Sequence, residues 1–145
     1  MKCAVCENKE CVNGKDCTRI KEQIINFYSG ADLELLRISA SVESDFYMKG
    51  TRLDELINFA LRMNYTRLGI AFCTGLENEA KYIHRILEKT GFHVFSVVCK
   101  VCGIDKSLLK LNKLKRKGFQ ATCNPAGQAM ILNENKTDLN IIIGL

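Results

Sequence analysis

Four of the eight cysteines lie in the first seventeen residues, separated by two, four and five residues. Four thiolates complete the tetrahedral shell of a zinc ion or supply the four anchors of a 4Fe–4S cluster. The short separations let one loop wrap around an ion, and Gly14 lets the backbone turn between the last two cysteines. The sequence therefore predicts a metal site, with zinc and iron–sulfur both open and free or disulfide-bonded thiols as the alternative. Its ligands would be Cys3, Cys6, Cys11 and Cys17.

The other four cysteines stand beside the expected ends of strands. Cys73 and Cys99 each end an expected strand, Cys102 follows in the second of these loops, and Cys123 precedes a helix. Loops that follow parallel strands gather at one edge of a sheet, where the ligands of open α/β sheets bind. Helix N-termini at that edge favour thiolate anions. This pattern predicts a second thiolate site, again for zinc or an iron–sulfur cluster. Buried core cysteines are one alternative, and a nucleophile at Cys73 or Cys123 is another.

Three helices are expected between the cysteine-rich loop and the sheet, within residues 18–64. Apolar residues recur at helical spacing in each of them, and Gly30 and Gly50 mark the ends of the first two. Thr51 and Asp54 have the spacing of a capping box, so we expect the third helix to begin there.

Residues 65–145 alternate apolar runs of strand length with amphipathic segments. Strands are expected at Arg67–Cys73, His93–Cys99 and Leu139–Leu145, and helices at Glu77–Lys89, Asp105–Lys117 and Pro125–Glu134. Strands that are apolar on both faces and alternate with helices indicate a parallel sheet. The expected fold class is therefore α/β, a small Rossmann-like βαβαβ sheet of three strands. We expect one domain, 1–145, built from a metal-binding loop (1–17), helices (18–64) and the βαβαβ unit (65–145).

Composition places the chain among ordinary globular proteins. Its 145 residues, 47% hydrophobic and 26% charged, suit one domain with a core and exclude collagen-like, coiled-coil and disordered classes. The apolar runs are far shorter than the ~20 residues of a membrane helix, and the N-terminus has no apolar signal segment. We therefore expect a cytoplasmic protein without a membrane partner. In a reducing cytoplasm, clustered cysteines bind metal or do redox chemistry more often than they form disulfides.

A basic run interleaved with leucines lies in the second half of the chain. Its cations are Lys106, Lys110, Lys113, Lys115, Arg116 and Lys117. A solvated helix face explains this pattern, and a phosphate or nucleic-acid contact is the alternative. Because the net charge of +5 is small and dispersed, we do not expect nucleic acid as a partner. We expect structural roles for the two histidines, His84 and His93.

Several motifs together carry a family resemblance over nearly the whole chain. They are Met-Lys-Cys-Ala-Val-Cys at 1–6, Gly-Lys-Asp-Cys at 14–17, Gly-Ile-Ala-Phe-Cys at 69–73, Val-Cys-Lys-Val-Cys-Gly-Ile-Asp at 98–105, Cys-Asn-Pro-Ala-Gly-Gln at 123–128 and Leu-Asn-Ile-Ile-Ile-Gly-Leu at 139–145. The chain resembles a prokaryotic family of unknown function whose cysteine-rich members are described at most as metal-binding. The resemblance implies metal binding and an α/β fold, and it implies no activity.

The resemblance includes one departure. Chains of that family continue past the last strand with a further cysteine and a histidine, whereas this chain stops at Leu145. We therefore expect a shortened member or a fragment. An unpaired last strand would also favour homo-oligomers.

Three functions follow from these patterns. The first is a cytoplasmic metal-binding protein in which the two cysteine groups hold zinc or iron–sulfur clusters, with redox or sulfur chemistry at the second. The second is an enzyme with a cysteine nucleophile and a structural N-terminal metal. The third is a zinc-stabilised module that contacts nucleic acid through the basic run.

Overall fold

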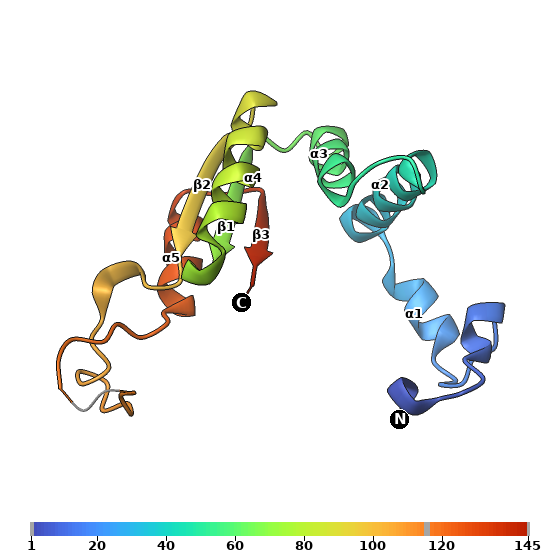
Figure 1. Ribbon diagram of the computed structural model, residues 1–145. Helices are drawn as coiled ribbons and strands as arrows, with labels where there is room; N and C mark the ends of the chain where they lie inside the picture. The colour runs from blue at the N-terminus through green and yellow to red at the C-terminus, as the bar shows by residue number, and fades with distance from the viewer. Residues whose placement is uncertain (1, 115–116, 145) are drawn as a thin grey trace. The chain divides into compact units, whose positions relative to one another are not determined.

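A computed structural model of the chain describes residues 2–114 and 117–144. The chain divides into two compact units, Met1–Ser41 and Val42–Leu145, and each is described by itself. The helices are α1 (Lys21–Phe27), α2 (Gly30–Phe46), α3 (Arg52–Arg62), α4 (Glu77–Lys89) and α5 (Pro125–Glu134), and the strands are β1 (Arg67–Phe72), β2 (His93–Val98) and β3 (Leu139–Ile143) (Figure 1). No helix in the described part of the chain is long and apolar enough to span a membrane.

The N-terminal unit begins with the cysteine-rich loop, which contains two short 3-10 turns at Cys3–Val5 and Glu10–Asn13. Asp16 connects this loop to α1. Its carboxylate accepts hydrogen bonds from the hydroxyl and backbone N–H of Thr18, and from the N–H groups of Arg19 and Lys21. These bonds, the Thr18 hydroxyl first, lower the pKa of Asp16 to about 2. An ionised carboxylate therefore holds the loop at the point where α1 begins.

The expected capping box at α3 is confirmed. The Thr51 hydroxyl accepts the backbone N–H of Asp54 at 3.2 Å, and the Asp54 carboxylate accepts the backbone N–H of Thr51 at 2.8 Å. Two backbone donors that would have no partner at the start of the helix are thereby satisfied.

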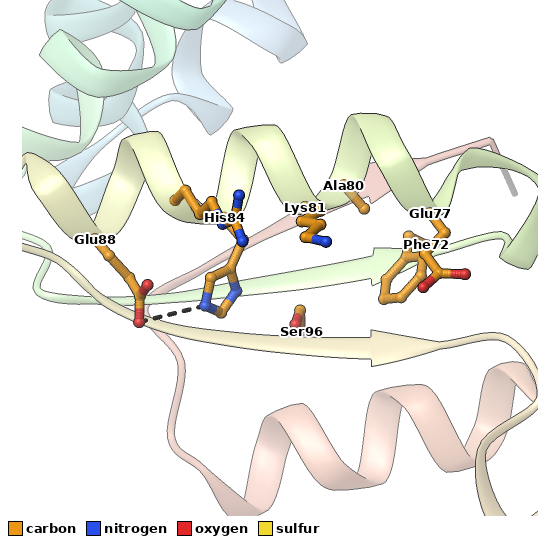
Figure 2. A pocket seen from close by; sticks show the side chains of 8 residues that line it. Phe72, Glu77, Ala80, Lys81, His84, Glu88 and Ser96 are labelled. Carbon is orange, nitrogen blue, oxygen red and sulfur yellow. Dashed lines mark ion pairs between the residues drawn. The ribbon is translucent and has the colours of Figure 1, made fainter.

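The predicted parallel sheet is also confirmed. Its strand order is β2-β1-β3, with both pairs parallel. Figure 2 shows α4 above the strands and α5 below them, so the two crossover helices cover opposite faces of the sheet. The segments that leave β1 and β2 therefore part at the carboxyl edge and lead to opposite faces. In open α/β sheets, ligands bind where such connections diverge.

The core of the sheet unit lies around the central strand. Leu68 and Ile70 of β1 are fully buried, as is Leu87 of α4. They form one cluster with Ala60 and Phe92. A smaller cluster, made of Ala71, Val97 and Leu132, packs β1 and β2 against α5. Because β1 is flanked by a strand on each side and contacts both crossover helices, its side chains hold the unit together.

The predicted helix at Asp105–Lys117 is wrong. Residues 106–110 form turns, and a single antiparallel bridge pairs Asp105 with Ala121. The Asp105 carboxylate accepts the N–H of Ser107 at 2.7 Å and of Gln120 at 3.1 Å, and it pairs with the Lys113 ammonium. These contacts close the segment into a loop, and its leucines remain exposed for lack of a core to pack against. Two cations of the basic run, Lys115 and Arg116, lie outside the described residues, as does Leu145 at the end of the third predicted strand.

The start of the sheet depends on one carboxylate. Asp138 accepts the backbone N–H groups of Thr66 and Arg67, each at 2.8 Å. These hydrogen bonds, that of Arg67 first, lower the pKa of Asp138. A lowered pKa means that the carboxylate stabilises the fold above the ordinary aspartate pKa of about 4. That stabilisation is lost as the pH falls through the folded-state pKa.

Asp138→Asn is therefore expected to lower the free energy of unfolding at pH 7. The deficit should shrink as the pH falls below about 4, because the wild-type carboxylate is then itself protonated. Urea unfolding of both proteins at pH 7 and in acid checks this. A difference in stability that stays constant over that range would contradict the assignment.

Candidate functional site

The four N-terminal cysteines line one pocket of about 500 Å³, together with charged residues of the same loop. All four thiols are exposed and unpaired by disulfides. The Cys11 thiol lies 3.7 Å from the carbonyl oxygen of Lys9, and the Cys17 thiol lies 3.9 Å from that of Lys15. Across residues 2–114 and 117–144, no three Cys, His, Asp or Glu side chains converge closely enough to hold a metal ion. The structure thus places the predicted ligands around one cavity without gathering them into a coordination shell.

Charged side chains of both signs surround these thiols. Lys2, Lys9 and Lys15 line the pocket with the acidic Glu10 and Asp16, and the Lys15 ammonium pairs with the Glu10 carboxylate. Ammonium groups near a cluster of thiolates offset part of the negative charge that such a cluster carries.

Three of the four remaining cysteines come together at the carboxyl edge of the sheet. The N–H of Cys73 donates to the carbonyl of Ile143, and the N–H of Cys99 donates to that of Phe72, so both residues extend the strand ladder by one step. The Cys99 sulfur, 1% exposed, accepts the N–H of Thr74 at 3.5 Å. Loops from two strands therefore meet at the Cys99 thiol.

Cys123 joins this group from the segment that precedes α5. The Lys100 ammonium lies 3.3 Å from its sulfur and also donates to the carbonyl of Ala121 at 3.2 Å. The hydrogen bond and charge of Lys100, with smaller contributions from the Cys99 thiol and the Lys106 charge, lower the pKa of Cys123 below that of an ordinary thiol. Cys123 is exposed, so its sulfur is open to reagents in solvent.

Cys102 stands apart from the other three. It is exposed and has a positive φ of 69° in the turn at Val101–Gly103. In the described part of the chain, no hydrogen bond joins its side chain to Cys73, Cys99 or Cys123. Of the four cysteines predicted at one edge, Cys73, Cys99 and Cys123 lie at the carboxyl ends of the strands and the start of α5, and Cys102 lies in the turn after β2.

Asn124 and Gln128 hold the start of α5 against this edge. The Asn124 side chain accepts the N–H of Gly127 at 2.9 Å and donates to the carbonyl of Val101 at 3.2 Å. Its backbone N–H donates to the carbonyl of Cys99 at 2.8 Å. The helix expected at Pro125–Glu134 has these bounds in the structure, and Asn124 is its N-cap with proline in the first turn. These bonds fix the segment in which Cys123 lies.

Gln128 is 2% exposed, and its amide nitrogen donates to the carbonyls of Phe72 at 3.3 Å and Val97 at 2.9 Å. Gln128→Met is therefore expected to destabilise the unit by about 1–3 kcal/mol, because buried carbonyls lose their donor. Met130→Ala, at a position 63% exposed on the same helix, should change stability by less than about 0.5 kcal/mol. Urea unfolding of the two variants measures the difference, and equal effects would show that Gln128 does not hold the strand ends.

A second cavity of about 420 Å³ lies between α4 and β2 (Figure 2). His84 lines it, and its Nε2 atom lies 3.3 Å from a carboxylate oxygen of Glu88. Lysine, arginine and glutamate side chains of α4 also line the cavity, so no single charge dominates it. His93, the other histidine, begins β2, and its backbone N–H donates to the carbonyl of Thr66. Neither histidine lies in the cysteine groups.

Lys100 is the residue that sequence reasoning missed. It stands between two cysteines of the segment Cys-Lys-Val-Cys at 99–102, where an ordinary surface lysine is the default expectation. Its role arises because the turn after β2 directs its ammonium toward a cysteine more than twenty positions away.

Comparison with known proteins decides the family. The model of the family named Protein of unknown function (DUF1847) matches residues 11–145. The chain belongs to this family. The matched residues include six of the eight cysteines, from Cys11 onward. The family resemblance inferred from the motifs is thereby confirmed.

A relative from Methanocaldococcus jannaschii, Uncharacterized protein MJ0455, is 52% identical over 147 residues. That alignment covers all of this chain and 76% of the relative. No solved structure matches the chain.

Proposed function

We propose that this DUF1847 member binds either one zinc ion or one iron–sulfur cluster through Cys3, Cys6, Cys11 and Cys17. The observation that carries the proposal is the placement of all four thiols around one pocket within a single short loop. Thiolates are soft ligands that select zinc, copper(I) and iron–sulfur over harder ions. The donor set therefore fits such a group in number and in chemistry.

The lack of a core in the N-terminal unit supports the same proposal. No described residue among positions 2–41 is buried, and only two, Leu33 and Ile38, are even half-buried. A segment with so little buried apolar surface needs another source of order, and a metal cross-link supplies it. Binding would draw the four sulfurs from the walls of the pocket into one shell, so metal binding and ordering of the loop are one process.

The group's own contribution would be a cross-link for zinc, or electron transfer for a cluster. The chain's residues supply the ligands, and Lys2, Lys9 and Lys15 lie where they offset the charge of four thiolates. The proposal requires a reducing compartment such as the cytoplasm, in which these thiols stay unpaired.

The proposed metal site does not include the cysteines at the carboxyl edge of the sheet, Cys73, Cys99 and Cys123. The Lys100 ammonium contacts the Cys123 sulfur directly at 3.3 Å and occupies the position on that sulfur that a metal ion would take. The Cys99 sulfur is buried and accepts the Thr74 N–H, so it has less freedom to enter a coordination shell than the thiols of an exposed loop.

The test is metal analysis and an absorption spectrum of the full chain purified without oxygen. About one zinc per chain with no visible absorption would identify a zinc site, and a brown protein with iron and sulfide would identify a cluster. Cys11→Ser should reduce the bound metal to below about a tenth of the wild-type content. Cys102→Ser, which changes an exposed cysteine outside the pocket, should keep it. Equal loss in both variants, or wild-type protein without metal, would refute the proposal.

A further inference from the structure

The carboxyl edge of the sheet carries two thiols in contrasting environments. Cys123 is exposed and lies 3.3 Å from an ammonium group, whereas Cys99 is 1% exposed and accepts a backbone N–H. The backbone N–H of Asn124 donates to the Cys99 carbonyl at 2.8 Å, which places the segment of Cys123 beside Cys99. An exposed thiol next to an ammonium group and a neighbouring buried thiol together have the arrangement that a two-step thiol–disulfide exchange requires.

We propose that Cys123 and Cys99 form a dithiol that reduces small anionic disulfides, with Cys123 as the attacking and Cys99 as the resolving residue. This goes beyond the metal site, because it uses neither the N-terminal cysteines nor a bound metal. Cys102 is closer to Cys99 in the sequence, but the hydrogen bond from the Asn124 N–H to the Cys99 carbonyl brings the segment of Cys123 to Cys99.

The first step forms a mixed disulfide. The Cys123 thiolate attacks one sulfur of the substrate R–S–S–R, and a disulfide bond forms between the Cys123 sulfur and that substrate sulfur. The substrate S–S bond breaks at the same time, and the other half leaves as R–S⁻. The Lys100 ammonium favours the thiolate form of Cys123 and lies beside the reacting sulfur. The exposure of Cys123 gives the substrate access, whereas burial keeps Cys99 from reacting first.

The second step releases the other half of the substrate. The Cys99 sulfur attacks the Cys123 sulfur, the Cys99–Cys123 disulfide forms, and the second R–S⁻ leaves. The proton of the Cys99 thiol passes to one leaving thiolate, so the products are one R–SH and one R–S⁻. Two electrons move from the dithiol to the substrate, and no other oxidant or reductant takes part.

The charges near Cys123 indicate the substrate class. Lys100 contacts the sulfur, and the charge of Lys106 also reaches it. These two cations favour a disulfide that carries negative charge.

The experiment mixes the full-length, anaerobic protein with oxidised glutathione and follows each cysteine by peptide mass mapping. Wild type should form a Cys99–Cys123 disulfide. Cys99→Ala should stop at a glutathione adduct on Cys123, and Cys123→Ser should form neither. Circular dichroism of Cys99→Ala shows that it is folded, and Cys99→Val replaces it if it is not. Cys102→Ser, the neighbouring control, should behave as wild type.

Two further experiments test the activation of Cys123 by Lys100 and the preference for a negatively charged disulfide. Lys100→Met should raise the pKa of Cys123 and slow the reaction of Cys123 at pH 7 by about threefold for each unit of that rise. The pH–rate profile of Cys123 should move to higher pH. Cystamine, a cationic disulfide, should react more slowly than oxidised glutathione. The proposal is overturned if Cys102 pairs with Cys99, if Cys99→Ala still closes a disulfide, or if Lys100→Met leaves the profile unmoved. Because mapping reports each cysteine separately, these outcomes are distinct from failure of the N-terminal metal site.

Discussion

Replacing Ile70 with alanine is expected to destabilise the sheet unit by about 2–5 kcal/mol. Ile70 is fully buried at the middle of β1, where it pairs with Ser96 of β2 and Ile141 of β3. Removing its side chain deletes buried apolar contacts and leaves a cavity that the flanking strands are too constrained to fill. Urea unfolding followed by circular dichroism gives the change in the free energy of unfolding.

Ile142→Ala on β3 is the matched control, because it makes the same chemical change at a side chain that is 69% exposed. Its effect should be about 0.5 kcal/mol or less. Equal losses at the two positions would show that β1 is not the centre of the core.

Removing the metal that we propose for the N-terminal loop is expected to expose this cysteine-rich loop to proteolysis. The loop has no buried side chain of its own, so without the cross-link it should sample open states freely. Trypsin cleavage after Lys9, Lys15 and Arg19 should become about tenfold faster, or more, after treatment with a chelator.

The sheet unit serves as the internal control in that digestion, because its core does not depend on the metal. Cleavage within residues 67–98 should keep the same rate with and without chelator. Unchanged cleavage of the loop would mean that metal does not order it.

The parts of the fold that sequence predicted well are those in which local pattern and tertiary packing agree. The helix expected at Glu77–Lys89 has these same bounds in the structure, because its apolar face, with Ala80 and Leu87, is the face that the sheet buries. The capping box of Thr51 and Asp54 is a local interaction and needs no tertiary context.

The segment after Asp105 shows where a local pattern fails. Leucines at helical spacing predict a helix there, but in the structure these leucines are exposed and form no buried face. The Asp105 carboxylate instead bonds to residues on both sides of the loop, including Gln120. A contact across fifteen positions is invisible to a pattern based on spacings of three and four.

At the candidate site too, the sequence predicts the general position of the cysteines but not their individual contacts. Topology alone predicts that cysteines after parallel strands meet at one edge, and Cys73 and Cys99 do lie there. It does not predict which cysteines interact, because that depends on the turn after β2. This turn leaves Cys102 exposed and brings Lys100 to Cys123.

Native mass spectrometry of the anaerobically purified full chain tests the proposed N-terminal metal site most directly. The wild-type chain should carry the added mass of one zinc ion or one iron–sulfur cluster. A variant with Cys3, Cys6, Cys11 and Cys17 all changed to serine should have the mass of the bare polypeptide, and Cys102→Ser should keep the added mass. A wild-type chain at bare polypeptide mass, or a fourfold serine variant that still carries the metal, would contradict the account.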